Sequence, residues 1–234
     1  MITVQPVSTI KNALGEGPLW DSDTQSLYWV DSLKGKISRL SGNDKVISWS
    51  LPCMIGSLAI VNKQSAIVAL QTGLHFFNFE NSELTPICDP EAEMPETRFN
   101  DGKTDRSGNF LVGSMGIKIR DRPIGALYRI NPDLEMEVLE PDVIVANGPC
   151  FSPDGDTFYF NDGRRRILAY DYDPTGSLQN KRVFFEGEKH NTSSDGATVD
   201  TQGNLWGALT GSSEIGCIRP DGKLIERIQM PINL

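Results

Sequence analysis

The sequence predicts an all-β fold of the β-propeller type. Short segments rich in Val, Ile, Phe, Tyr and Trp alternate with Asp-Gly, Asn-Gly and Pro-Asp-Gly turns, as the strands of antiparallel sheets do. One pattern of turn, strand, turn and strand recurs along the chain. No convincing amphipathic helix interrupts it, so a repeated sheet unit is the expected building block.

The spacing of the repeat sets the size of each unit. The pattern begins at residues 16, 56, 100, 147 and 195, so consecutive starts lie 40 to 48 residues apart. Propeller blades are four-stranded antiparallel sheets of about 40 to 50 residues and have this spacing. An ordinary β-sandwich uses similar turns but has no reason to repeat at this interval. We therefore predict about five blades in a single propeller domain spanning residues 1–234.

Each copy of the pattern supplies an inner strand, a second strand after a tight turn, and a third strand. The copy that begins at residue 56 is the weakest of the five. Third strands are predicted at residues 36–40, 74–79, 126–130, 167–172 and 215–219. A fourth strand at residues 225–230 would complete the last blade.

The repeat leaves the number of blades in the ring open. A sixth copy would start at about residue 240, whereas the sequence ends at Leu234. The chain is therefore expected to form either a five-bladed ring or a six-bladed ring that lacks its closing blade at the C-terminus. In the second case residues 1–10 and 223–234 would carry open sheet edges, which favour self-association.

Composition limits the classes of function. The chain has 22 Lys and Arg against 31 Asp and Glu, a net charge of −9, which disfavours binding to nucleic acid. It has no apolar run of about 18 residues, so no membrane association is expected. Its first ten residues do not resemble a signal peptide, and its four cysteines are isolated. These features are typical of a cytoplasmic protein with reduced thiols.

Four polar residues occupy the same phase of the repeat. They are Glu16, Asn100, Asn147 and Asp195. Because the inner strands of a propeller line its central channel, these side chains are expected to meet at one mouth of that channel. Two carboxylates and two amides form an all-oxygen set of the kind that hard divalent cations prefer. Any one of them alone is more simply a turn residue, and the shared phase is what favours a metal site.

Other chemistries find less support. The sequence has no Gly-x-Ser-x-Gly nucleophile motif and only two histidines. It also lacks the glycine-rich loops that bind phosphates in nucleotide-binding proteins. A serine hydrolase triad and a nucleotide site are therefore not expected.

Several motifs resemble the senescence-marker-protein/gluconolactonase/regucalcin family of six-bladed propellers. They are Gly15-Glu-Gly-Pro, Leu27-Tyr-Trp-Val-Asp, Arg98-Phe-Asn-Asp-Gly-Lys, Asn147-Gly, Ser152-Pro-Asp-Gly, Asp195-Gly-Ala and Asn204-Leu-Trp. The resemblance runs from about residue 13 to the end of the sequence, and it is specific in the order and spacing of the motifs. Full-length relatives carry about one further blade.

The resemblance implies one divalent metal ion (Ca, Zn, Mn or Mg) held by Glu16, Asn147 and Asp195. Asn100 would lie beside the ion, and Arg98 would bind substrate oxygens. Asp195 would also be the general base. The implied activity is the hydrolysis of a sugar lactone to an aldonic acid. Two alternatives are a calcium-binding or regulatory propeller without turnover and an inactive, truncated fragment.

One loop departs from the family pattern. Many relatives carry a substrate-contacting Glu shortly after a Gly-Thr-Met motif, but here Gly113-Ser-Met precedes a basic segment. Lys118 stands near the matching offset, and Arg120 and Arg122 follow it. The loop is either a solvated turn or a contact for a lactone that bears a phosphate, sulfonate or carboxylate. On the second interpretation Lys118 binds the substrate.

Overall fold

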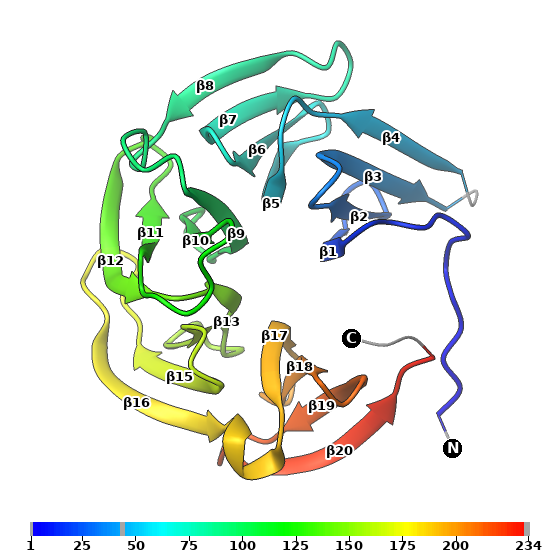
Figure 1. Ribbon diagram of the computed structural model, residues 1–234. Coiled ribbons are helices and arrows are strands. Elements are labelled where there is room, and N and C mark those ends of the chain that lie inside the picture. The colour runs from blue at the N-terminus through cyan, green and yellow to red at the C-terminus, as the bar shows by residue number, and fades with distance from the viewer. Residues whose placement is uncertain (1, 43–44, 232–234) are drawn as a thin grey trace.

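The computed structural model describes residues 2–42 and 45–231. These residues form five antiparallel sheets of four strands, arranged as blades around a common centre (Figure 1). Each blade uses four consecutive strands, and the first strand of each lies innermost. The prediction of an all-β propeller is confirmed.

The strands follow one another in chain order. The first blade contains β1 (Gly15–Asp21), β2 (Ser26–Asp31), β3 (Lys36–Ser41) and β4 (Val46–Ser50). The second contains β5 (Ile55–Asn62), β6 (Ser65–Leu70), β7 (Gly73–Asn78) and β8 (Leu84–Cys88). The third contains β9 (Thr97–Thr104), β10 (Phe110–Gly116), β11 (Gly125–Ile130) and β12 (Met136–Val143). The fourth contains β13 (Asn147–Phe151), β14 (Thr157–Asn161), β15 (Arg166–Asp171) and β16 (Gln179–Glu186). The fifth contains β17 (Ser193–Val199), β18 (Leu205–Thr210), β19 (Glu214–Ile218) and β20 (Leu224–Gln229).

Helical structure is confined to one short turn in the described part of the chain, η1 (Gly187–His190), between the fourth and fifth blades. No helix within residues 2–42 and 45–231 has the length and apolar character needed to cross a bilayer.

Apolar packing joins each blade to the next. In the first of four buried clusters, Tyr28 of β2 packs with Val68 of β6 and Phe77 of β7. In the last, Ile167 of β15 packs with Leu205 of β18. The other two clusters join the second blade to the third and the third to the fourth. The hydrophobic core is therefore a series of blade interfaces.

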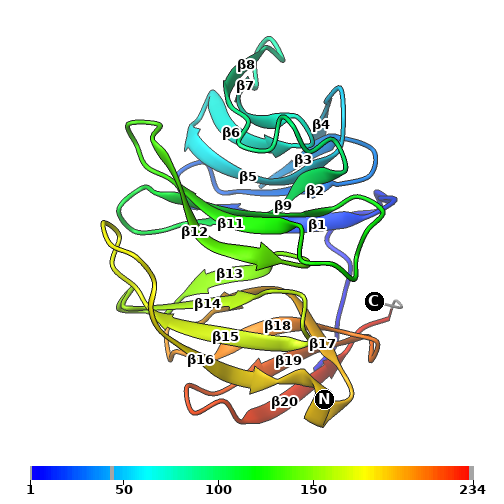
Figure 2. The same ribbon diagram turned by 60° about the vertical axis from the view of Figure 1, so that its left-hand side comes forward.

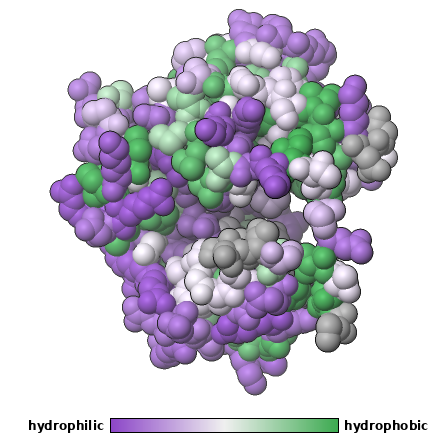
Figure 3. All heavy atoms as spheres, turned by 45° about the vertical axis from the view of Figure 1, so that its right-hand side comes forward, coloured by the Kyte–Doolittle hydropathy of each residue, from purple (hydrophilic) through white to green (hydrophobic). Residues whose placement is uncertain are grey.

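The fifth blade does not share such an interface with the first. None of the buried clusters among the described residues joins these two blades. Figure 3 shows the surface hollowed between them. The described chain has five blades, so the expected six-bladed ring is not confirmed.

Every innermost strand carries at least one residue more than the strand beside it. In the first blade Glu16 pairs with Val30 and Leu19 with Tyr28, so three steps along β1 match two along β2. The same excess of one residue occurs in β9, β13 and β17, and β5 has two such places, one near each end. Such β-bulges bend a strand and redirect its side chains. Outside the second blade, each bulge coincides with or directly follows a polar residue selected from the repeat.

The bulges also bring neighbouring inner strands into close contact. A Cβ atom at Gly56 would lie 2.2 Å from the carbonyl oxygen of Asn100, and one at Gly148 would lie 2.7 Å from that of Asp195. Gly148 also has a φ of +58°, which L-residues with side chains rarely adopt. Glycine at these two positions allows the inner strands to approach one another.

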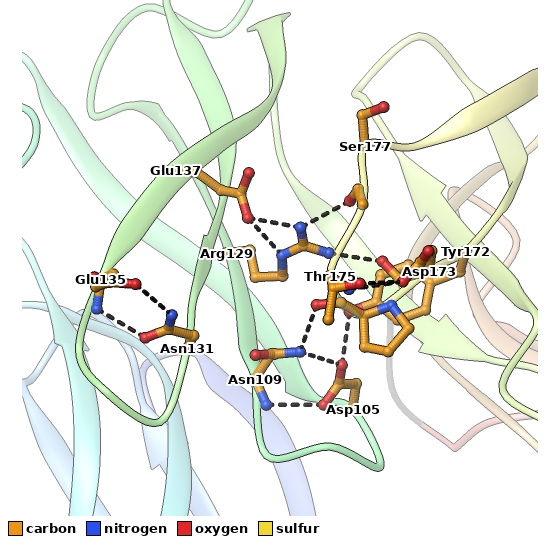
Figure 4. A network of polar contacts seen from close by, with 12 residues as sticks. Asp105, Asn109, Arg129, Asn131, Glu135, Glu137, Tyr172, Asp173, Thr175 and Ser177 are labelled. Carbon is orange, nitrogen blue, oxygen red and sulfur yellow. Dashed lines mark hydrogen bonds and ion pairs between the residues drawn. The ribbon is translucent and has the colours of Figure 1, made fainter.

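A buried arginine connects the outer parts of the third and fourth blades (Figure 4). Arg129 of β11 is 2% exposed. Its Nε and Nη2 donate to Oε1 of Glu137, at 2.8 and 2.6 Å. Its Nη1 and Nη2 donate to the carbonyl oxygens of Asp173 and Gly176, at 2.8 and 2.7 Å, in the loop between β15 and β16. One guanidinium thus satisfies acceptors on two blades.

Replacing this arginine should destabilise the fold. We expect Arg129→Met to reduce the free energy of unfolding by about 3 kcal/mol, because it leaves two carbonyl oxygens without their donor. Urea denaturation measures the change. Glu137→Gln is the comparison and should cost less, since the Glu137 side chain is 56% exposed. An Arg129→Met protein as stable as the wild type would contradict this role.

The close approach at Gly56 gives a second prediction. Gly56→Ala should reduce the free energy of unfolding by about 1–3 kcal/mol, because the new methyl group meets the backbone of the next blade. Gly42→Ala is the matched control, since a Cβ there has nothing within 4 Å. Thermal denaturation of both variants tests the difference, and equal stabilities would rule out the steric argument.

Candidate functional site

The predicted site residues lie where the innermost strands begin. Glu16 is in β1, Arg98 and Asn100 are in β9, Asn147 opens β13 and Asp195 is in β17. These four strands surround the centre of the ring (Figure 1). Segments far apart in the sequence thus meet at one end of the channel, as the repeat predicts.

The two amides form a direct pair. Nδ2 of Asn100 donates to Oδ1 of Asn147 and to the carbonyl oxygen of Ala146, both at 2.8 Å. The first bond identifies Oδ1 of Asn147 as the acceptor and leaves that oxygen a second lone pair. The carbonyl oxygen of Asn100 accepts a hydrogen bond from the Ser57 hydroxyl at 2.8 Å. Asn100 is therefore held by both neighbouring blades.

The two predicted carboxylates lie close enough to repel each other. Burial, followed by the charges of Asp195 and Asp101, raises the pKa of Glu16 to about 8, and Arg98 partly opposes this rise. Burial also raises the pKa of Asp195, which the Gly196 N–H and the charge of Arg120 oppose. Within the described residues, no hydrogen bond reaches the Glu16 carboxylate. An unpartnered acid beside a second one is a suitable environment for a cation.

A third carboxylate, Asp101, belongs to the same site and is absent from the predicted set. Its Oδ2 accepts a hydrogen bond from the Gly148 N–H and its Oδ1 one from the Gly102 N–H, both at 2.8 Å. Burial raises its pKa to about 6 in spite of these bonds. The motif Asn100-Asp-Gly contains it, but an Asp-Gly pair in a sequence is most simply a turn signal. Its link to the fourth blade exists only in the folded ring.

Arg98 is a buried cation within this acidic group. Its residue is 4% exposed, and its Nη1 donates to the carbonyl oxygen of Phe99 at 2.8 Å. Burial and the charge of Arg120 lower its pKa to about 10, while Glu16 raises it. The described part of the chain gives its guanidinium no other hydrogen bond and no ion pair within 4 Å. Several of its N–H groups are therefore available to a ligand.

Lys118 differs from the other predicted residues in its position. It is exposed on the loop between β10 and β11, and no hydrogen bond or ion pair joins it to the rest of the site within residues 2–42 and 45–231. Its role in substrate binding stays a prediction.

The donor chemistry of the site fits a hard cation. Among the described residues, no three His, Cys, Asp or Glu side chains form a group that could hold a metal ion by themselves. An ion bound between Glu16 and Asp195 would therefore need the amide oxygen of Asn147 as a further ligand. Such an ion would relieve the repulsion that raises the pKa of Glu16. The residues present therefore fit a divalent cation with oxygen ligands.

The sequence also matches a family as a whole. Residues 14–234 match the SMP-30/gluconolactonase/LRE-like region. The chain belongs to this family. The resemblance inferred from the motifs is thus confirmed, and it extends across all five blades.

Relatives in the family have similar sequences over most of the chain. L-arabinolactonase from Azospirillum brasilense is 36% identical over 227 residues, which cover 94% of this chain and 75% of the relative. 6-deoxy-6-sulfogluconolactonase from Pseudomonas putida is 31% identical over 232 residues, 98% of this chain and 79% of the relative. The crystal structure of a calcium-binding protein, regucalcin from Agrobacterium tumefaciens, gives a TM-score of 0.91 at 28% identity and covers 96% of this chain and 77% of its own.

Two further pockets lie away from this site. One of about 280 Å³ lies where β9, β13 and β17 end, and its lining includes Lys103, Cys150 and Thr198. The other, of about 260 Å³, lies between the ends of β1 and β5. Neither is lined by a residue of the predicted site, so the site belongs to the opposite end of the inner strands.

The raised pKa of Glu16 predicts a pH dependence of stability. Between pH 4.5 and about 8 its carboxyl group is protonated in the metal-free folded protein and ionised in the unfolded chain. The folded state binds more protons in this window, so its free energy of unfolding falls as the pH rises. Glu16→Gln should remove this loss, about 3 kcal/mol, in urea denaturation series of the metal-free protein from pH 5 to 8.

The control for this prediction is Glu93→Gln, an exposed acid in the loop before β9. Its stability profile should run parallel to that of the wild type. A Glu16→Gln profile that is also parallel would show that burial of Glu16 does not govern the dependence.

Proposed function

We propose that this protein hydrolyses a sugar lactone to the corresponding aldonic acid, with one divalent cation bound by Glu16, Asn147 and Asp195. The observation that carries the proposal is the meeting of two mutually repelling carboxylates with an ordered amide oxygen and a buried arginine. Membership of the family supports it. So do the names of two relatives, an L-arabinolactonase and a 6-deoxy-6-sulfogluconolactonase.

The side chains divide the chemistry between them. A bound cation supplies Lewis-acid polarisation of the lactone carbonyl. Asp195 accepts a proton from the attacking water. The C–O bond of the lactone ring then breaks, and the ring oxygen takes up that proton. Water is thus added across the ester bond, with no other reactant.

The remaining residues position the reactants. Asn100 orients the amide of Asn147 through their hydrogen bond. Arg98 donates its free N–H groups to substrate oxygens. Lys118, as the sequence predicts, contacts the substrate from the exposed loop. Asp101 acts through the Gly148 N–H, because that bond fixes the bulge directly after Asn147.

A calcium-binding propeller without turnover is the second candidate. The calcium-binding protein regucalcin from Agrobacterium tumefaciens has the same fold, with a TM-score of 0.91, and the oxygen donors here suit Ca²⁺. The two candidates share their ligands and differ in whether water attacks a bound lactone. Turnover is therefore the measurement that distinguishes them.

The five blades also fit a six-bladed ring from which one sheet is missing between the fifth blade and the first. The hollow between these blades supports this arrangement (Figure 3). Self-association through the open edges would cover the same surface. A cytoplasmic location stays a prediction based on the isolated cysteines, all four of which are free thiols in the structure.

Loss of the metal ion or of Asp195 should abolish hydrolysis. We expect Asp195→Asn to lower kcat/KM for D-glucono-1,5-lactone or L-arabinono-1,4-lactone by at least about 100-fold, since it removes the general base and a charged ligand. Treatment with a chelator should have a similar effect, reversed by adding back Ca²⁺, Zn²⁺, Mn²⁺ or Mg²⁺. Acid release above the spontaneous background measures both.

Asp133→Asn, an exposed acid in the turn after β11, is the control and should keep wild-type activity. Full activity of Asp195→Asn would exclude Asp195 as the base. Absence of turnover with every metal, together with a metal-dependent rise in Tm, would favour the calcium-binding candidate.

A further inference from the structure

Asn161, at the end of β14, is a buried amide that connects the fourth blade to the fifth. These two blades lie side by side (Figure 2) and share an apolar cluster. Asn161 is 2% exposed, and its Nδ2 donates to the carbonyl oxygen of Ser194 in β17. Its Oδ1 accepts a hydrogen bond from the Gly163 N–H at 2.8 Å, which fixes the orientation of the amide. Both polar atoms of this side chain therefore have partners, one of them in the next blade.

The carbonyl group that Asn161 holds lies directly before Asp195. Ser194 pairs with β18, and Ala197 is the next residue of β17 that does so. Asp195 and Gly196 lie between these two pairs, in the bulge, where strand pairing does not fix the backbone. The peptide group that joins Ser194 to Asp195 is planar, so a bond to its carbonyl oxygen also restrains the backbone nitrogen of Asp195. Asn161 therefore holds the point at which the chain enters the bulge.

The same arrangement occurs one blade earlier. Nδ2 of Asn100 donates to the carbonyl oxygen of Ala146 at 2.8 Å, and Ala146 directly precedes Asn147. In both cases an amide of one blade holds the carbonyl group just before a predicted ligand of the next blade. Asn100 lies in the first strand of its blade and Asn161 in the second, so the sequence repeat does not relate them. They are related by the contact that each makes.

Asn161 also lies beside a second predicted ligand. In the ladder between β13 and β14 it is paired with Asn147. One residue of β14 thus stands next to Asn147 in its own blade and holds the backbone before Asp195 in the next blade. Two ligands of one ion must keep a fixed separation, and contacts behind the ligands maintain it.

We propose that Asn161 is a positioning residue, which sets the place of Asp195 relative to Asn147. The inference rests on the proposed lactone hydrolysis, in which Asp195 is both a ligand and the general base. Asn161 touches neither the substrate nor the cation and acts through the carbonyl group of Ser194. Without its N–H donor the bulge can shift, and a base displaced from the proton it accepts is a poorer catalyst.

The test removes the donor and keeps the acceptor. Asn161→Asp retains an oxygen for the Gly163 N–H and loses the N–H group that reaches Ser194. At saturating metal, kcat for D-glucono-1,5-lactone should fall about tenfold or more while KM stays within about threefold, as expected for a contact that supports a ligand. Isothermal titration calorimetry with Mn²⁺ should show a loss of affinity of similar size. Asn161→Ala, which introduces no charge, should give the same two results.

Asn109→Ala is the matched control for a general loss of contact between blades. Asn109 is also buried, at 5% exposed, and its Nδ2 donates to the Pro174 carbonyl oxygen of the next blade at 3.1 Å, at the other end of the strands. This variant should lose stability without a change in kcat or in metal affinity. An equal loss of kcat in Asn109→Ala would overturn the proposal, as would wild-type kcat and metal affinity in Asn161→Asp.

Hydrogen exchange separates this role from the proposed function. In the metal-free protein, the backbone amides of residues 194–197 should exchange faster in Asn161→Asp than in the wild type, and at the wild-type rate in Asn109→Ala. Unchanged exchange in Asn161→Asp would overturn the positioning role, whether or not a lactone is hydrolysed. Faster exchange in a protein whose wild type hydrolyses no lactone would support the role of Asn161 and contradict the lactonase function alone.

Discussion

One extra residue near the start of four innermost strands determines where the functional side chains point. Side chains in a regular strand alternate between its two faces. The backbone N–H and C=O groups of the strand form hydrogen bonds with the neighbouring strand. The bulge interrupts this alternation at equivalent places in four blades, next to Glu16 and Asn147 and at Asn100 and Asp195. Because these bulges also touch one another around the ring, the position of each polar side chain depends on the blade beside it.

Among the described residues, the site brings two carboxylates together without an ion pair between them and a basic side chain. Elsewhere buried Asp162 is paired with Arg164 and Arg166, and buried Arg129 with Glu137. At the centre, Glu16 and Asp195 repel each other and have no ion pair in the described part of the chain. Repulsion of this kind lowers the stability of the free protein. It is tolerated where a ligand of opposite charge compensates it.

The fold could be predicted from the sequence because its repeat is local. The repeat of turn residues and apolar runs predicts the first residue of all five inner strands to within a few residues. The predicted starts at 56 and 147, for example, compare with observed starts at Ile55 and Asn147. The repeat also selected residues of the site, since equivalent positions in a ring face the same centre. The number of blades needed for closure is not a local property, and five were found.

Two features of the site depend on contacts between distant segments. Asp101 is not among the residues selected from the sequence, because its partner Gly148 belongs to another blade and no local pattern connects them. The basic loop was assigned through Lys118 by counting from a motif. In the structure Lys118 is exposed on the loop between β10 and β11, where the chain folds back tightly after Gly116. Sequence spacing measures distance along the chain, whereas loop geometry decides which side chain turns inward.

The arrangement of the blade interfaces has a mechanical consequence. Within residues 2–42 and 45–231, four apolar clusters join the five blades in a linear array, so the first and fifth blades each share such a cluster with one neighbour. In such arrays the terminal units open most readily. Glu16 belongs to the first blade and Asp195 to the fifth. An ion bound by both carboxylates would link the first blade to the fifth. Binding at the centre would therefore restrain both terminal blades at once.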